Sequence, residues 1–250
     1  MKTVIRTDIG KVRSHNEDYV GIFHNKGNEL LAVVADGMGG HLAGDVASQM
    51  ASTLLQNKWE ETGPITDPDQ GKRWLSDSLK DVNESLFRHA KENPDCMGMG
   101  TTIVAAIIHE SFAVIAHVGD SRCYMVTADG FQLLTEDHSL VNELVKTGQI
   151  SKKDAEHHPR KNVLLRALGT ETKVEVDIKT VPFKDGNILL LCSDGLSNKL
   201  SDEKIFEILR GEESLEEKAD TFIRLANDGG GEDNITLAII QNSQRGKAGD

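Results

Sequence analysis

The chain has 250 residues, of which 38% are hydrophobic, so it can bury a sizeable core as one large domain. Its 40 Asp and Glu residues outnumber 28 Lys and Arg residues, and the net charge of -12 argues against nucleic acid or an anionic membrane as the main partner. Cys96, Cys123 and Cys192 are widely spaced and odd in number, which argues against a disulfide framework or a zinc site.

The N-terminal segment, residues 2–9, is predicted to form a short strand. It meets charged residues too early for the apolar region of a signal peptide. No stretch of the chain approaches the ~20 apolar residues of a membrane helix. We therefore expect a cytoplasmic protein that has no membrane partner.

An antiparallel hairpin is predicted next, made of strands at residues 19–24 and 30–35 with a short polar turn between them. A polar loop at residues 11–18 precedes the first of these strands and carries Arg13. The second strand leads directly to Asp36. In an antiparallel pair Asp36 should therefore lie close to the loop that carries Arg13.

The residues after the second strand are unusual. An apolar run ends at Asp36 and is followed by Gly37, Gly39 and Gly40, which do not favour regular structure. The strand is therefore predicted to end at or near Asp36, with a carboxylate at its tip beside backbone that an ion or phosphate can approach. An ordinary Asp-Gly turn is the alternative interpretation.

Apolar residues at helical spacing predict two long helices, one around residues 46–55 and one around 74–87, separated near Gly63-Pro64. Their apolar stripes are interpreted as core, so Met50 and Trp74 need no ligand. Short segments rich in β-branched residues then predict an antiparallel meander with strands at 101–108, 112–118, 122–126 and 131–134.

The stretch from residue 135 to 161 is polar and interrupts this pattern around a short helical segment at Leu140, Leu144 and Val145. We interpret it as an exposed flap, about residues 135–170. Arg160, Lys161 and Arg166 could contact phosphopeptides there, or they could be solvated surface charges. The remaining predicted elements are strands at 174–181 and 188–192, helices at 202–210, capped by Asp202, and 214–227, and a strand at 235–240.

This order of elements indicates the α+β class, with two antiparallel sheets packed together and a pair of helices outside each sheet, a four-layer αββα sandwich. Residues 1–241 are predicted to form a single domain that includes the flap. Residues 242–250 are predicted to be a polar tail. We find no internal repeat and no domain linker.

Acids next to glycine recur where apolar runs end, at Asp36, Asp120 and Asp194, and Asp233 comes just before the last strand. They are either independent turn residues or the members of one site. In the second case they would repel one another unless cations neutralised them. Ligands that are all oxygen favour magnesium or manganese over zinc.

Six motifs follow one another along the chain: Arg13-x-x-x-Glu17-Asp18, Ala35-Asp36-Gly37-Met38-Gly39-Gly40, Gly98-x-Gly100-Thr101-Thr102, Gly119-Asp120-Ser121-Arg122, Ser193-Asp194-Gly195 and Glu232-Asp233-Asn234. Together they make the chain similar to the metal-dependent serine/threonine protein phosphatases of the PP2C type, above all the compact bacterial members. The resemblance spans residues 13–236.

The resemblance implies hydrolysis of phosphoserine and phosphothreonine in proteins by a water or hydroxide that bridges two Mn²⁺ or Mg²⁺ ions. Asp36 would bridge both ions, the carbonyl of Gly37 would bind one, and Asp194 and Asp233 would bind the other. Asp18, with Glu17 less directly, would act through bound water. Asp120 would help to hold a third, weaker ion, or would only stabilise its turn.

Arg13 would bind two phosphate oxygens with its planar guanidinium, or it would be a surface residue paired with Glu17 or Asp18. Many eukaryotic relatives carry a histidine as proposed general acid where this chain has Met38. The proton donor is therefore unassigned, and His15 and His41 are the nearby histidines.

Other interpretations fit less well. After Gly37 and Gly39 the third glycine of a dinucleotide-binding motif is replaced by Leu42. The sequence Asp67-x-Asp69-x-Gly71 resembles a calcium loop only faintly, and we interpret it as a solvated loop. An inactive scaffold that binds phosphoproteins would not need a full set of metal ligands. We expect a monomeric phosphatase whose partners are phosphoproteins and a bacterial serine/threonine kinase.

Overall fold

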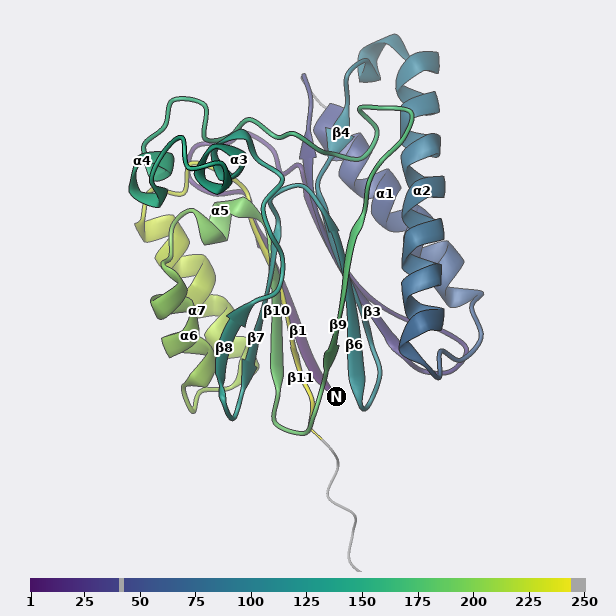
Figure 1. The fold of residues 1–250 in the computed structure, drawn as a ribbon, viewed down its shortest axis with the longest axis vertical. Coiled ribbons are helices and arrows are strands. Elements are labelled where there is room, and N and C mark those ends of the chain that lie inside the picture. The colour runs from purple at the N-terminus through teal and green to yellow at the C-terminus, as the bar shows by residue number, and fades with distance from the viewer. Residues whose placement is uncertain (41–42, 244–250) are drawn as a thin grey trace, which may run out of the picture.

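The computed structural model describes residues 1–40 and 43–243, which form two antiparallel sheets packed face to face between helices (Figure 1). The first sheet has the strand order β1 (Lys2–Asp8), β11 (Ile235–Gln241), β10 (Ile188–Cys192), β7 (Arg122–Thr127), β8 (Gly130–Leu133). The second has the order β2 (Asp18–His24), β3 (Leu30–Met38), β5 (Ile103–Ile108), β6 (Phe112–Val118), β9 (Asp177–Pro182), and β4 (Gly100–Thr101) pairs with the end of β3. The predicted α+β class is confirmed.

Each sheet is covered by helices on its outer face (Figure 1). The second sheet packs against α1 (Ala43–Glu60) and α2 (Pro68–Glu92), which a short 3₁₀ turn, η1 (Pro94–Cys96), follows. The first sheet packs against α5 (Asp194–Ser197), α6 (Asp202–Arg210) and α7 (Leu215–Asp228). The segment that we named the flap, about residues 135–170, contains α3 (Leu140–Lys146) and α4 (Lys152–Glu156). The described helices do not combine the length and apolar composition that crossing a bilayer requires.

Strand β3 is buried on both faces, which explains its uninterrupted apolar sequence. Leu31, Val33 and Ala35 face α1 and α2, whereas Leu30, Ala32 and Val34 face the other sheet. Because side chains alternate along a strand, the next residue on the second face is Asp36. The period of two therefore directs this carboxylate into the space between the sheets.

Two details of the prediction were wrong. Strand β3 does not end at Asp36 but continues to Met38, because Gly37 and Met38 pair with Thr101 and Gly100. The predicted meander is split, because β5 and β6 belong to one sheet and β7 and β8 to the other. The chain crosses between the sheets at residues 119–121.

Corrections of smaller extent concern the ends of elements. The cap of α6 is Ser201, whose Oγ accepts a hydrogen bond from the backbone N–H of Lys204, and not Asp202. Strand β9 starts at Asp177 rather than at residue 174. In the tail, Asn242 is buried and donates to the carbonyls of Glu110 and Phe183, while residues 244–250 lie outside the described part.

Candidate metal centre

Strands β2 and β3 bring Asp18 and Asp36 together, because the two residues are direct partners in the antiparallel register. Val20 and Ile22 of β2 pack into the core between the sheets. Asp18, two residues before Val20, therefore faces the same space as Asp36. Neighbouring strands of one hairpin thus place two carboxylates side by side at the end of the sandwich.

Strands β10 and β11 of the other sheet do the same for Asp194 and Asp233. Asp194 follows the last residues of β10, and Asp233 precedes the first residue of the antiparallel neighbour β11. The backbones approach so closely that a Cβ on Gly195 would collide with the carbonyl oxygen of Asn234. Gly195 therefore has to be glycine for Asp194 and Asp233 to face each other across this strand pair.

Asp120 enters from the crossing between β6 and β7. The preceding Gly119 has a φ of 108°, a conformation that favours glycine, and a Cβ there would contact Thr102. Thr102 and Ser121 share a hydrogen bond of 2.8 Å between their hydroxyls, which ties the crossing to the start of β5. The crossing is fixed, and it delivers a further carboxylate to the same end of the sandwich.

The electrostatics show that these carboxylates form one cluster. Burial, followed by the neighbouring Asp18, Asp194, Asp120 and Asp233 charges, raises the pKa of Asp36 well above its ordinary value. Burial is also the main cause of the raised pKa of Asp18, about 7, Asp120, about 8, and Asp194, about 6. Several acids that repel one another at one place are stable as anions only if cations accompany them.

Hydrogen bonds orient individual members of this cluster. Ser193 Oγ donates to Asp18 Oδ2 at 2.8 Å, and Asn198 Nδ2 donates to Asp194 Oδ2 at 3.0 Å. Asp36 and Asp194 lie close enough to share a proton, and this interaction opposes the rise in the pKa of Asp194. The donor set consists of oxygen atoms alone, and hard ions such as Mn²⁺ and Mg²⁺ fit it.

Gly37 lies beside these acids in a tightly packed position. Its N–H donates to the carbonyl of Glu17 at 3.0 Å, and a Cβ would collide with the carbonyl of Gly44. Thr101 Oγ1 and the Thr102 N–H both donate to the carbonyl of Asp36. The backbone that follows Asp36 is therefore held from several sides.

Arg13 reaches the cluster from the polar loop after β1. Its Nη2 lies 2.8 Å from Asp233 Oδ2, so it pairs with neither Glu17 nor Asp18, the partners that the alternative interpretation named. About half of the Arg13 side chain is exposed to solvent. A guanidinium at the rim, with room on its other edge, can bind an anion that enters the site.

Asn234 is the functional residue to which sequence reasoning gave no role. Its side chain accepts from the N–H of Glu17 at 2.8 Å and donates to the carbonyls of Ile9 and His15. It therefore fastens the loop that carries Arg13 to the start of β11. The only signal in the sequence was its place in the Glu232-Asp233-Asn234 motif.

The candidates for a proton donor are placed as follows. His15 is partly exposed, with Nε2 3.3 Å from Glu17 Oε1 and Nδ1 2.9 Å from Ser14 Oγ. Met38 is half-buried at the end of β3. His41 lies outside the described residues.

The flap lies at the same end of the sandwich as β4 and α5 (Figure 1). Arg166, one of the three flap cations considered for phosphopeptides, is ion-paired with Glu175 and Asp177, both at 3.1 Å. Lys199 is ion-paired with Glu232 and lowers the pKa of that acid, and the charge of Lys161 acts in the same direction.

Residues for which we predicted a purely structural role lie in the core or at the end of a helix. Met50 and Trp74 pack against the core under α1 and α2. Asp67 caps α2 by accepting from the N–H groups of Asp69 and Gln70, so this segment is a helix start rather than a solvated loop. Cys192 is buried, which raises the pKa of its thiol to about 12, and the three cysteines are free.

Comparisons with known proteins agree over the length of the chain. The family model described as protein phosphatase 2C matches residues 10–228. The serine/threonine phosphatase stp of Listeria innocua is 51% identical over 249 residues, which cover 99% of this chain and 99% of that protein.

Solved structures show the same fold. The crystal structure of serine/threonine phosphatase Stp1 from Staphylococcus aureus has a TM-score of 0.90 at 40% identity, over 95% of this chain and 93% of that chain. The catalytic domain of the serine threonine protein phosphatase PstP, in complex with two manganese ions, has a TM-score of 0.83 at 34% identity, over 95% and 96% of the two chains.

Proposed function

Since this chain belongs to the protein phosphatase 2C family and is a serine/threonine protein phosphatase, we propose that it hydrolyses phosphoserine and phosphothreonine by direct attack of water at a two-ion centre. The observation that carries the proposal is the convergence of five aspartates from both sheets, four of which have a raised pKa. A cluster of this kind is suited to binding cations of high charge.

We propose the following ligands for the ions. Asp36 would ligate both ions, the Gly37 carbonyl would ligate one, and Asp194 and Asp233 would ligate the other. Asp18 would act through bound water. When bound, such ions lower the pKa of water and offset the negative charge of the phosphoryl group. The related PstP catalytic domain is in complex with two manganese ions, which supports a centre of two ions.

Asp120 is assigned to a third, weaker ion that it shares with Asp194. Its pKa is raised first by burial and then by the charge of Asp194, so the two carboxylates are close enough to interact. Asp120 enters from the crossing between the sheets and not from the strand pairs that carry the other ligands. This separate origin fits a separate ion.

Arg13 is proposed to bind the phosphate of the substrate. In the structure it pairs with Asp233, which is itself a proposed ligand. Ions bound at Asp233 would weaken this pair, because they neutralise the carboxylate. The guanidinium would then be available to bind two phosphate oxygens in a bidentate arrangement.

Replacing Arg13 with Ala should lower kcat/KM for a phosphothreonine peptide by about 10- to 100-fold, the loss expected for charge-assisted hydrogen bonds. Arg13→Lys should recover only part of this loss, because an ammonium cannot bind bidentately. The matched control is Lys11→Ala in the same loop, whose cation lies 3.8 Å from Asp228. An Arg13→Ala enzyme with unchanged kinetics would refute the assignment.

The proposed substrates are phosphorylated proteins, and a bacterial serine/threonine kinase would supply them. The chain itself is proposed to act as a monomer. Related phosphatases of Listeria and Streptococcus carry names that agree with this substrate class. An inactive phosphoprotein-binding scaffold is disfavoured, because all the proposed ligands are present and converge.

The decisive experiment is the release of phosphate from a phosphothreonine peptide by the protein stripped of ions and then supplied with Mn²⁺. We expect turnover with Mn²⁺ and its loss on chelation. Binding of the peptide without turnover would favour the scaffold. Turnover that survives an excess of chelator would refute the two-ion mechanism.

A further inference from the structure

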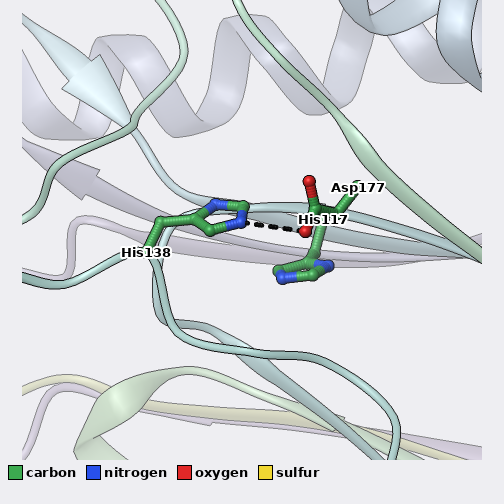
Figure 2. Close-up of side chains that lie close together, drawn as sticks. All are labelled: His117, His138 and Asp177. Carbon is green, nitrogen blue, oxygen red and sulfur yellow. Dashed lines mark ion pairs between the residues drawn. The ribbon is translucent and has the colours of Figure 1, made fainter. Parts of the chain in front are cut away.

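His117, His138 and Asp177 form a second polar cluster behind the crossing that carries Asp120 (Figure 2). They come from β6, from the start of the flap and from β9, and His117 and Asp177 are direct partners across two strands. The imidazole rings are stacked with centroids 4.7 Å apart and planes 15° apart. His138 is buried, with 8% of its side chain exposed.

These three side chains are of types that ligate metals, but their hydrogen bonds and lone pairs are not directed at a common point. His117 Nε2 lies 2.9 Å from the carbonyl of Glu136. The two rings are nearly parallel, so their lone pairs, which lie in the ring planes, do not converge on one ion. In addition, the guanidinium of Arg166 already lies 3.1 Å from Asp177 Oδ1. The charge of Asp177 is therefore already balanced by a guanidinium.

The hydrogen bonds of His138 are directed at Gly119, the residue before Asp120. The N–H of Gly119 donates to His138 Nδ1 at 3.1 Å, and the N–H of His138 donates to the carbonyl of Gly119 at 2.9 Å. Gly119 is therefore held at both its polar backbone groups by a single residue. Its left-handed conformation, with φ at 108°, decides where the Asp120 carboxylate points.

Asp177 controls the tautomer of His138. Because Nδ1 accepts the Gly119 N–H, neutral His138 must carry its proton on Nε2. Two groups lie 3.4 Å from Nε2, namely Asp177 Oδ2 and Arg166 Nη1. Figure 2 marks the ion pair with Asp177 by a dashed line. A guanidinium can only donate, so the carboxylate is the group of the two that can accept from the Nε2–H. Arg166 fixes the other oxygen of Asp177. Asp177 thus fixes the proton of His138, His138 holds the backbone of Gly119, and Gly119 sets the position of Asp120.

We propose that His138 and Asp177 are positioning residues that hold Asp120 in place for the third, weaker ion. The proposal rests on the proposed function, in which Asp120 is a ligand of that ion. It also joins the flap to the ion site, because Arg166 lies in the flap and bonds the carboxylate of Asp177. Partners that orient a ligand from outside commonly change metal affinity by about 10- to 100-fold when they are replaced.

Asp177→Asn tests the tautomer directly. Arg166 should hold the amide oxygen of the new side chain, so its NH₂ group would face His138 Nε2 and force the proton to Nδ1, where it opposes the Gly119 N–H. In protein free of ions, ¹⁵N NMR of the imidazole should show the change from Nε2–H to Nδ1–H. Exchange of the Gly119 amide should become faster.

Titration with Mn²⁺, followed by EPR of the free ion, should then show the weakest class of sites weakened by about tenfold. The two tighter sites should keep their affinity. A changed tautomer with unchanged weak binding would overturn the proposal, and so would a parent protein that binds only two ions.

Two substitutions of His138 provide a matched pair. Asn places its Oδ1 near the position of Nδ1, so His138→Asn keeps an acceptor for the Gly119 N–H and should retain weak-site affinity. Gln places its polar end near the position of Nε2, so His138→Gln should lose this affinity. Equal losses in both variants would mean a merely structural role and would overturn the proposal.

These outcomes are distinguishable from a failure of the proposed function. If the parent enzyme showed no turnover that depends on Mn²⁺, the two-ion mechanism itself would be refuted. If the parent turned over and bound a third ion, and Asp177→Asn left that ion unaffected, only the positioning role would be refuted.

Discussion

Asp36→Asn is expected to abolish phosphate release and, at the same time, to make the protein without ions more stable. The amide keeps the shape of the side chain but cannot bridge two cations. The loss of several kcal/mol of transition-state stabilisation corresponds to a decrease in kcat of about 10³-fold or more. Burial and four neighbouring carboxylates raise the pKa of Asp36, so a neutral residue there removes a source of repulsion.

The measurement pairs kcat at saturating Mn²⁺ with the Tm in the presence of EDTA. Asp77→Asn, at an exposed position on α2, is the matched control and should change neither quantity. An Asp36→Asn protein that is inactive but has a lower Tm than the parent would show that Asp36 is structural. Activity equal to the parent would refute its role as a bridging ligand.

In the absence of ions, the free energy of unfolding should fall as the pH rises from 6.5 to 8. Asp18 and Asp120 have pKa values of about 7 and about 8 in the folded protein, whereas such groups ionise near 3.9 in an unfolded chain. In this interval the folded state therefore binds more protons than the unfolded state. Stability then decreases by about 1.4 kcal/mol per pH unit for each proton that is retained, or about 2 to 3 kcal/mol from Asp18 and Asp120 together. The raised pKa of Asp36 adds to the decrease in the same direction.

The interval starts at pH 6.5 because histidines act in the opposite direction below it. Burial lowers the pKa of His117 and His138, so protonation at lower pH favours the unfolded chain and stability falls as the pH falls. Between pH 6.5 and 8 the aspartates dominate. Urea unfolding in EDTA at pH 6.5, 7, 7.5 and 8 measures the slope.

Two further measurements identify the source of the slope. Asp120→Asn should make it shallower, because one of the retained protons is lost. Mn²⁺ should stabilise the parent more at pH 8 than at pH 6.5, because ions compete with protons for the same carboxylates. A stability in EDTA that rises over this interval would contradict the electrostatic description of the site.

Much of the fold was predictable because its signals are local. A continuous apolar run of strand length identified β3, and the helical spacing of apolar residues identified α1 and α2. The antiparallel hairpin of β2 and β3 followed from a short turn, and it brought Asp18 and Asp36 together as predicted. Residues that form an element by contacts within a few positions leave a periodic pattern that can be read directly.

The errors arose where partners far apart in the chain decide the structure. Gly37 and Met38 continue β3 only because Gly100 and Thr101 arrive beside them. The sharp crossing at Gly119 separates β6 from β7, although a meander would have satisfied the same local pattern. Such choices depend on which strand edges are available in the folded molecule, and short-range propensity does not contain that information.

The sequence by itself determined the class of fold, the six motifs and the identity of the acids, because each is encoded in residues close together in the chain. Only the tertiary structure decided that Arg13 pairs with Asp233 and that Asn234 fastens the Arg13 loop. The same holds for the ion pairs of Arg166 with Glu175 and Asp177. These contacts join residues up to 220 positions apart. A long polar side chain has many partners within reach, and packing of the two sheets selects one of them.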